Sequence, residues 1–296
     1  MFRRIGFFIL MNAAVLLTVS IVLNVLGVGS YVTQYGLDYQ SLMIFCLVWG
    51  MAGSFISLAL SKWMAKRMMG VQIVDGDPRY AGLVNTVHRL AKAANLPKMP
   101  EVGIFDSPEV NAFATGPSKS NSLVAVSTGL LHNMRDDEVE GVLGHEVAHI
   151  ANGDMVTMTL IQGVVNAFVM FLARVAAFAV QNALSKDEDS PVGGFAYYGT
   201  VIVFDILFGF LGMFVTAWFS RMREYRADQG GAKLAGRSNM VNALKRLQSQ
   251  YAQGVFDKRT EEMNAFKISS KGGGIMSLIS THPRLEDRII RLETGR

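Results

Sequence analysis

Four long stretches of the chain carry almost no charge, and they constrain its fold more than any other feature. Residues 5–28 hold no charged side chain over 24 positions, and residues 42–60 hold none either. Residues 155–184 and 192–220 contain one charged residue each. A helix as long as the first stretch extends about 36 Å, which is enough to cross the hydrocarbon core of a bilayer. We therefore expect four transmembrane helices arranged as two hairpins.

The composition supports a membrane protein and excludes several other classes. Half of the 296 residues are hydrophobic, 18% are charged and the formal net charge is +4, which argues against a disordered chain or a nucleic-acid-binding tail. The single cysteine, Cys46, permits neither an internal disulfide nor a cysteine-rich metal site. Arg3 and Arg4 precede the first apolar stretch as in a signal peptide. That stretch is too long for a cleaved signal and no small-residue cleavage site follows, so we interpret it as an anchor.

The two charges within the later stretches need partners. Arg174 and Asp205 lie at similar depths on helices expected to be antiparallel, so they can pair with each other. Alternatively, one of them faces a water-filled groove, or this second hairpin is only partly immersed in the membrane.

The distribution of Lys and Arg predicts the orientation in the membrane. Basic residues flank the same ends of the hairpins, while the connecting loops at residues 29–41 and 185–191 hold one lysine between them, so both termini and both polar segments should lie in the cytoplasm. The basic residues are interpreted as contacts with anionic lipid. They are Arg3, Arg4, Lys62, Lys66, Arg67, Arg221, Arg223 and Arg226. The chain is thus divided into membrane hairpins at 1–61 and 155–220 and cytoplasmic segments at 62–154 and 221–296.

The polar segments predict a small mixed α and β domain. Apolar residues at helical spacing indicate a helix over residues 81–94 and another that begins near Asp136. Between them, three short runs read as strands, with a hairpin connection at residues 116–121. The strands are expected at 101–106, 111–115 and 122–127, and further helices at 239–251 and 283–292.

The helix that begins near Asp136 carries a motif typical of metal hydrolases. His145 and His149 are four residues apart and share a helix face, so both imidazoles can bind one ion, and Glu146 can reach a water on that ion. Two histidines and one carboxylate leave a fourth position for water, as in hydrolytic zinc sites. The alternative is that both histidines are solvated or core residues. That is disfavoured because a buried helix face rarely holds such a set without partners.

A third ligand is sought just after the fourth apolar stretch. Glu224 and Asp228 are four residues apart on one expected helix face, so one carboxylate can bind the metal while the other orients a ligand imidazole. Alternatively, the segment is an exposed helix paired with the interleaved arginines. The hairpin between the two halves brings its ends together, and this favours a joint site close to the membrane surface.

Together these motifs resemble the HtpX proteases, which are bacterial inner-membrane zinc endopeptidases related to the CAAX-processing prenyl-protein proteases. The resemblance covers essentially the whole chain and shows no departure at the expected ligand positions. Its motifs occur in the order of the family: Asn-Ala-Phe-Ala-Thr-Gly at 111–116, His-Glu-Val-Ala-His at 145–149, Glu-x-x-x-Asp at 224–228 and Ser-Thr-His-Pro at 280–283.

The resemblance implies a role for each residue of the site. His145, His149 and Glu224 would bind one zinc ion, Glu146 would be the general base, and Asp228 would hold a ligand histidine. The implied fold is a membrane α+β protein with four transmembrane helices in two hairpins and a cytoplasmic zincin-like metalloprotease domain, in which a small sheet accompanies the HExxH helix. The implied activity is hydrolysis of misfolded or damaged membrane proteins in stress-related quality control at the bacterial inner membrane.

Two further residues are candidates for the reaction. His282 lies in a rigid polar insertion between two helices and could donate to the oxyanion of the tetrahedral intermediate, although a helix-capping turn explains the same sequence. Asn111 lies on a short strand that could form the rim of the cleft, where an extended substrate adds as a strand and Asn111 anchors its backbone. A similar Asn-Ala-Phe strand does this in thermolysin-like peptidases. The alternative is an ordinary edge-strand asparagine.

Two other classes of protein remain as rivals. A membrane adaptor with a structural metal would need four closed ligand positions, and only three good ligands are found. A transporter built on the two intramembrane charges would need broken helices or an internal repeat, and the sequence has neither. The expected partners are membrane-protein substrates and the lipid bilayer, with no nucleic acid. Self-cleavage is also expected, because the glycine-rich residues 271–274 offer an exposed target.

Overall fold

The computed structural model of the chain describes residues 17–27, 30–33, 36–184, 194–253 and 280–295. Contacts between residues divide the chain into two units. The first unit comprises Met1–Ser57 and Thr159–Thr216, and the second comprises Leu58–Met158 and Ala217–Arg296.

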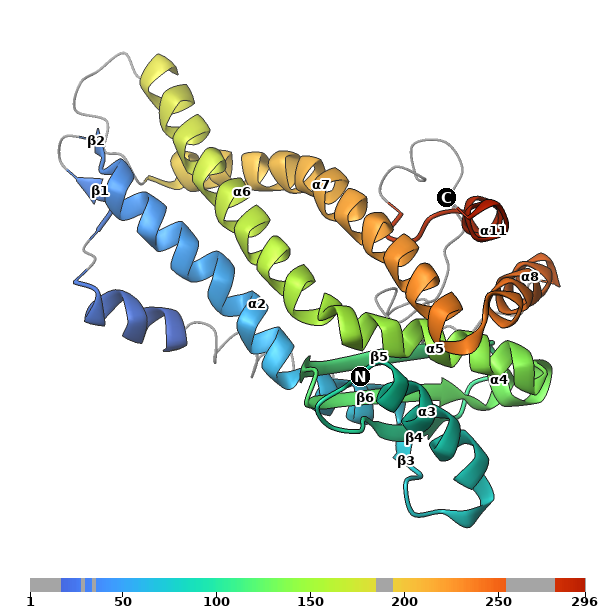
Figure 1. Cartoon of the computed structure of the whole chain (residues 1–296). Helices are drawn as coiled ribbons and strands as arrows, with labels where there is room; N and C mark the ends of the chain where they lie inside the picture. The colour runs from blue at the N-terminus through green and yellow to red at the C-terminus, as the bar shows by residue number, and fades with distance from the viewer. Residues whose placement is uncertain (1–16, 28–29, 34–35, 185–193, 254–279, 296) are drawn as a thin grey trace. The chain divides into compact units, whose positions relative to one another are not determined.

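Within the described residues, three helices are long and apolar enough to cross a membrane (Figure 1). They are α2 (Tyr39–Met69), α6 (Asp154–Leu184) and α7 (Phe195–Ala235). Large apolar side chains point outward from them, as with Phe168 and Ile206, whose exposed fractions are 60% and 69%. The first half of the first expected span, residues 5–16, lies outside the described residues, and residues 17–25 are helical. The count of four spans therefore stays a prediction.

The helices extend further than the apolar stretches within them. Helix α2 runs on to Met69, and α7 runs on to Ala235, where Gly236 with φ of 97° follows. Hydropathy locates only the apolar part of a helix, whereas its end is set by a residue that leaves helical geometry. As a consequence, Glu224 and Asp228 lie on the same helix as the fourth apolar stretch.

In the first unit, the apolar helices pack through small residues and one charged pair. A Cβ at Gly50 of α2 would lie 2.7 Å from the backbone nitrogen of Ala167 in α6, so the two helices approach closely there. The Nη1 atom of Arg174 lies 3.9 Å from Oδ1 of Asp205, which confirms the pairing that the sequence allows. The Arg174 guanidinium also lies over the ring of Phe45, 5.7 Å from its centroid. A short antiparallel pair, β1 (Val32–Thr33) with β2 (Gly36–Leu37), also belongs to this unit.

The second unit contains a four-stranded sheet in the order β3-β4-β6-β5. Strands β4 (Glu101–Phe105) and β6 (Asn121–Ser127) are parallel, and β5 (Ala112–Ser118) pairs with β6 as an antiparallel hairpin. The edge strand β3 (Gln72–Ile73) is antiparallel to β4 and was not expected from the sequence, because two residues carry no alternation. Strand β5 therefore forms the opposite edge of the described sheet.

The β5–β6 hairpin is longer than the sequence predicts. A strand ending at residue 115 was expected because Gly116 and Pro117 follow it, but β5 continues to Ser118. Gly116 has φ of 142°, and the register shifts between Thr115 and Ser118, so the glycine produces an irregularity in the ladder and not its end. A side chain at Gly116 would also clash with the carbonyl oxygen of Asn121.

Helices enclose the helix that bears the histidines, α5 (Asp136–Asn152). It packs against β5, β6 and α3, and against α8, which in turn packs against α11 (Figure 1). These helices are α3 (Ala81–Ala93), α8 (Arg237–Gln253) and α11 (Leu285–Thr294), with a short α4 (Thr128–Asn133) and a 3-10 turn η1 (Pro78–Tyr80) completing the unit. Val142, Leu143, Val147 and Ile150 of α5 are all buried in the shared core, so the position of α5 is fixed by apolar packing.

At least four of the basic residues assigned to lipid contact have partners within the protein. Arg221 donates to the carbonyl oxygen of Ser280 at 3.0 Å, and Arg223 lies 3.5 Å from the Glu224 carboxylate. The Nζ atoms of Lys62 and Lys66 lie 2.9 and 2.5 Å from the carboxylate of Glu101 at the start of β4. Both lysines are on the part of α2 that runs beyond the apolar stretch.

We predict that Gly141→Ala destabilises the second unit. The new methyl group would clash with the backbone carbonyl of Asn239, where α5 meets α8, and overpacking of this kind costs about 1–3 kcal/mol. The thermal unfolding midpoint of the detergent-purified protein should fall. The matched control is Gly82→Ala, because a Cβ there meets no atom within 4 Å; this variant should unfold at the wild-type temperature or above. Equal midpoints for the two variants would contradict the close approach of α5 and α8.

Candidate active site and metal centre

The helix α5 holds three of the candidate site residues in a buried position. It begins at Asp136 as expected, and the carboxylate of Glu138 accepts the backbone N–H of Arg135 at 2.8 Å, which satisfies a donor of the first turn. His145 and Glu146 are buried, with exposed fractions of 2% and 5%. Their burial deep in the unit requires partners for each polar atom.

Glycines allow α7 to approach α5 at the histidines. A Cβ at Gly231 of α7 would lie 2.9 Å from the backbone nitrogen of His145, and one at Gly144 of α5 would lie 2.9 Å from Cβ of Ala235. Only residues without a side chain permit backbones to come this close. This contact places Glu224 and Asp228, on the same helix as Gly231, beside the histidines. Neither glycine belongs to a motif that the sequence reveals.

Three side chains converge on one point. Nε2 of His145 and Nε2 of His149 are 3.1 Å apart, and the Glu224 carboxylate oxygens lie 3.4 and 3.3 Å from them. One ligand atom from each of the three residues lies within 4.8 Å of the others, and within the described residues this is the only such group of His, Cys, Asp and Glu. The structure thus brings together the three residues that the sequence predicts as ligands.

The other ring nitrogen of each histidine faces a carboxylate. Nδ1 of His145 lies 2.9 Å from Oδ1 of Asp228, the residue expected to hold a histidine. Nδ1 of His149 lies 2.7 Å from Oδ2 of Asp154, a residue that no motif in the sequence indicated. The helix α5 ends at Asn152, and the following Gly153, whose φ is 72°, turns the chain so that Asp154 reaches back to His149. A carboxylate on Nδ1 fixes the ring and leaves Nε2 for a metal.

The charges of the cluster favour a cation at its centre. Burial disfavours a charged imidazole, but Asp228 and Glu224 outweigh this and raise the pKa of His145 to about 9. Burial likewise disfavours the charged carboxyl of Glu224, yet the neighbouring His282 and His149 hold its pKa well below the usual range. The pKa of Asp228 is lowered to about 2, because the charge of Arg288 outweighs the effect of burial. Two buried carboxylates are therefore ionised.

This donor set fits a divalent metal ion. Both oxygens of Glu224 are buried without a well-formed hydrogen bond among the described residues, and imidazole nitrogens lie 3.0–3.4 Å from them. Two imidazole nitrogens and one carboxylate oxygen at one point are ligands that Zn²⁺ prefers. A bound cation would satisfy the Glu224 oxygens and separate two imidazole nitrogens that otherwise face each other.

The two remaining candidates, His282 and Asn111, differ in their position relative to this cluster. Nδ1 of His282 lies 3.0 Å from Oε2 of Glu224, so His282 belongs to the cluster. Helix α11 starts at Leu285, two residues later than the sequence suggests, and its N-cap is Arg284, so His282 lies in the segment before the helix. Asn111 is 2% exposed and immediately precedes β5, where its backbone N–H donates to Oγ of Ser127 at 3.1 Å. It is thus adjacent to the edge strand that packs against α5.

Comparison with known families and proteins agrees with this geometry. Residues 79–295 match the model of peptidase family M48. The chain is 50% identical to a "Protease HtpX homolog" of Methylacidiphilum infernorum, with 99% of each chain covered. It is 53% identical to "Protease HtpX" of Psychrobacter sp., with 98% of this chain and 97% of the relative covered. A "Protease HtpX homolog" of Bacillus subtilis is 51% identical, with 99% of each chain covered.

One solved structure has a similar fold. The crystal structure of S. mikatae Ste24p matches with a TM-score of 0.60 and 17% identity over 86% of this chain. This chain spans 58% of the length of that structure. At this identity the likeness concerns the fold alone.

We predict that Asp154→Asn weakens metal binding although Asp154 is not itself a ligand. Loss of the carboxylate next to Nδ1 of His149 frees the ring to rotate, and the loss of such partners typically weakens metal affinity about 10–100-fold. Metal retained after dialysis against a series of chelator concentrations would measure the change. The control is Asp136→Asn at the exposed start of the same helix, which should retain metal as the wild type does. Retention of metal by both variants alike would rule out a role for Asp154.

Proposed function

The chain belongs to peptidase family M48, and on this premise we propose that it is a zinc-dependent endopeptidase that hydrolyses misfolded or damaged membrane proteins at the cytoplasmic side of the membrane. Membership in the family and the similarity to HtpX proteases, which confirms the resemblance found in the sequence, make it a metalloprotease. The three apolar helices found among the described residues, together with the similarity to HtpX proteases, make it a membrane protein. Beyond membership in the family, we propose the identity of the metal, the roles of the site residues, the substrates and a part in stress-related quality control.

The observation that carries the proposal is the convergence of His145, His149 and Glu224. We assign these three residues as the zinc ligands, one ion per chain. The two histidines come from α5 and the carboxylate from α7, and each histidine has a carboxylate at its second nitrogen. Three protein ligands leave a coordination position open, as hydrolytic sites require.

Glu146 is assigned as the general base. It follows His145 on α5 and is buried, so its carboxylate acts in a site of low dielectric constant. Zinc bound at the three ligands would polarise the scissile carbonyl and lower the pKa of the attacking water. Glu146 takes the proton of that water and later delivers it to the leaving amine.

His282 and Asn111 are assigned to the substrate. The contact of His282 with Glu224 supports a position beside the reacting carbonyl, where its ring can donate to the developing oxyanion. Asn111 precedes β5, an edge strand of the described sheet, and an extended substrate can pair with such an edge. In this arrangement Asn111 anchors the substrate backbone.

We predict that Glu146→Gln slows proteolysis about 10²–10⁴-fold but retains the metal. Removal of a general base typically slows a reaction about 10²–10⁴-fold, while the three ligands are unchanged. The assay follows cleavage of an unfolded membrane protein, and of the chain itself, by the detergent-purified protein with zinc and with chelator. The matched control is Glu140→Gln on the same helix, whose carboxylate only pairs with the exposed Arg89 at 2.7 Å. Cleavage by the Glu146→Gln variant at the control's rate would refute the assignment.

We further propose that the active site and both termini face the cytoplasm of a bacterial cell, with the chain in the inner membrane. The support is the sequence pattern of Lys and Arg beside the apolar stretches. In this proposal residues 1–61 and 155–220 form the membrane hairpins, and residues 62–154 and 221–296 form the protease segments. The lipid bilayer and membrane-protein substrates are then its partners.

Cysteine labelling tests this orientation. The substitution Ser120→Cys is made in a Cys46→Ala background, and Ser120 is exposed in the turn between β5 and β6. The new thiol should react with a membrane-impermeant maleimide only after spheroplasts are broken. The thiol of Ser30→Cys, at an exposed position in the loop expected on the opposite side of the membrane, should react in intact spheroplasts. The reverse pattern would show that the orientation is inverted.

A further inference from the structure

A completely buried arginine lies against the proposed metal centre. Arg288 of α11 has an exposed fraction of 0%, and no motif in the sequence pointed to it. Burying a guanidinium is costly unless its charge and its donors are all compensated. The contacts of Arg288 therefore indicate what it does in the fold.

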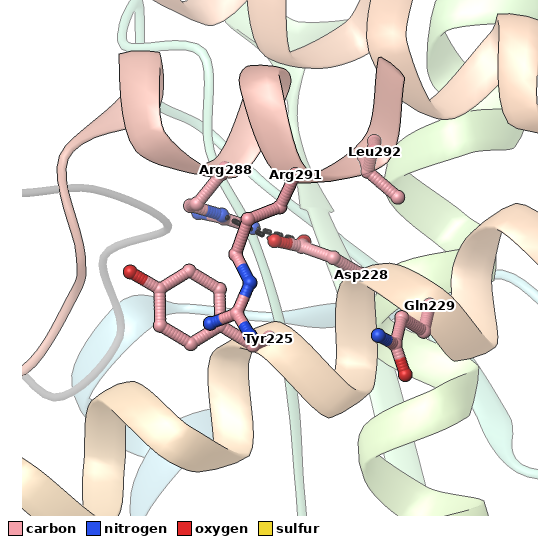
Figure 2. Close-up of a pocket in the computed structure, with 6 residues that line it drawn as sticks. All are labelled: Tyr225, Asp228, Gln229, Arg288, Arg291 and Leu292. Carbon is pink, nitrogen blue, oxygen red and sulfur yellow. Dashed lines mark hydrogen bonds and ion pairs between the residues drawn. The ribbon is translucent and has the colours of Figure 1, made fainter. Parts of the chain in front are cut away.

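Arg288 forms a bidentate ion pair with both oxygens of Asp228. Its Nε donates to Oδ2 at 2.8 Å and its Nη2 donates to Oδ1 at 2.6 Å, a two-pronged pair that fixes the plane of the carboxylate. Figure 2 shows the guanidinium aimed at Asp228, with Arg291 over the ring of Tyr225 beside it, 4.2 Å from the centroid. The Oδ1 atom that Nη2 contacts is the one that lies 2.9 Å from Nδ1 of His145.

The same guanidinium also reaches the carboxylate ligand. Its Nη1 lies 3.8 Å from Oε2 of Glu224, and its Nη2 lies 3.4 Å from Nδ1 of His145. Arg288 thus provides fixed positive charge between two buried carboxylates of α7, from a helix that supplies none of the three proposed ligands. A lysine could supply the charge but not the two-pronged geometry.

We propose that Arg288 is a positioning residue of the metal centre: it holds Asp228, which in turn holds the ring of His145 with Nε2 directed at His149 and Glu224. This inference rests on the proposed function, because it takes these three residues as the metal ligands. It adds that α11 takes part in metal binding without contributing a ligand.

The test measures zinc dissociation constants of the full chain in detergent by chelator competition. All variants carry Glu146→Gln so that self-cleavage does not interfere. Arg288→Met should raise the dissociation constant about 10–100-fold, and Arg288→Lys should also raise it, by less. Lys245→Met is the matched control, since it removes an exposed ion pair of 2.7 Å that also holds α11, to Glu293, and it should bind zinc as the parent does.

Unfolding of the metal-free proteins separates positioning from general stability. A purely structural role for Arg288 would lower the unfolding midpoint and leave the dissociation constant of the folded protein unchanged, and this result would overturn the inference. If Arg288→Met does not fold, the double variant Arg288→Met with Asp228→Asn removes both buried charges together. Its zinc affinity should equal that of Asp228→Asn alone within about twofold, because Arg288 acts through Asp228. If the loss of zinc affinity in the double variant equals the product of the losses in the two single variants, the inference is contradicted.

Glu224→Gln distinguishes failure of the inference from failure of the proposed function. If Glu224→Gln binds zinc as tightly as the parent, the ligand assignment fails. If Glu224→Gln loses zinc while both Arg288→Met and Arg288→Lys bind it as the parent does, only the role of Arg288 fails.

Discussion

Negative charge buried beside two imidazoles is the constraint on which the architecture of the second unit depends. Glu224 is 0% exposed and Asp228 is 2% exposed, and each ionised carboxylate costs several kcal/mol to bury without compensation. Positive charge must therefore converge on them from elsewhere in the chain. Helix α5 brings the histidines, α11 brings Arg288, and a metal ion bound at the proposed ligands would complete the balance. The core that packs these helices together thus also sets the electrostatics of the metalloprotease site.

The parts of the site that the sequence predicts correctly are those that depend on one helix. His145 and His149 share a face because they are four residues apart, and Glu224 and Asp228 share one for the same reason. That these two faces meet also followed from the hairpin between them. The two expected strands from residues 101 and 122 are found with similar bounds, since alternation and turn residues are local signals.

The parts that the sequence does not reveal depend on contacts between elements. Asp154 lies five residues after His149, outside helical spacing, and it reaches the ring only because Gly153 adopts a left-handed conformation. Arg288 has no spacing relation to any ligand. Gly231 has no functional side chain, and its importance lies in the backbone approach that it permits. A propensity or a hydropathy pattern contains none of this information.

The separation of Arg288 from His145 has a consequence for biosynthesis. The two residues are 143 positions apart, and α6 and α7 are translated between them. Helix α2 and then the histidines are therefore translated first, α6 and α7 follow, and the compensating guanidinium is translated last. A nascent chain lacks the full set of side chains around the carboxylates until α11 has been made. The side chains around the proposed metal centre are therefore complete only after every described apolar helix has been translated.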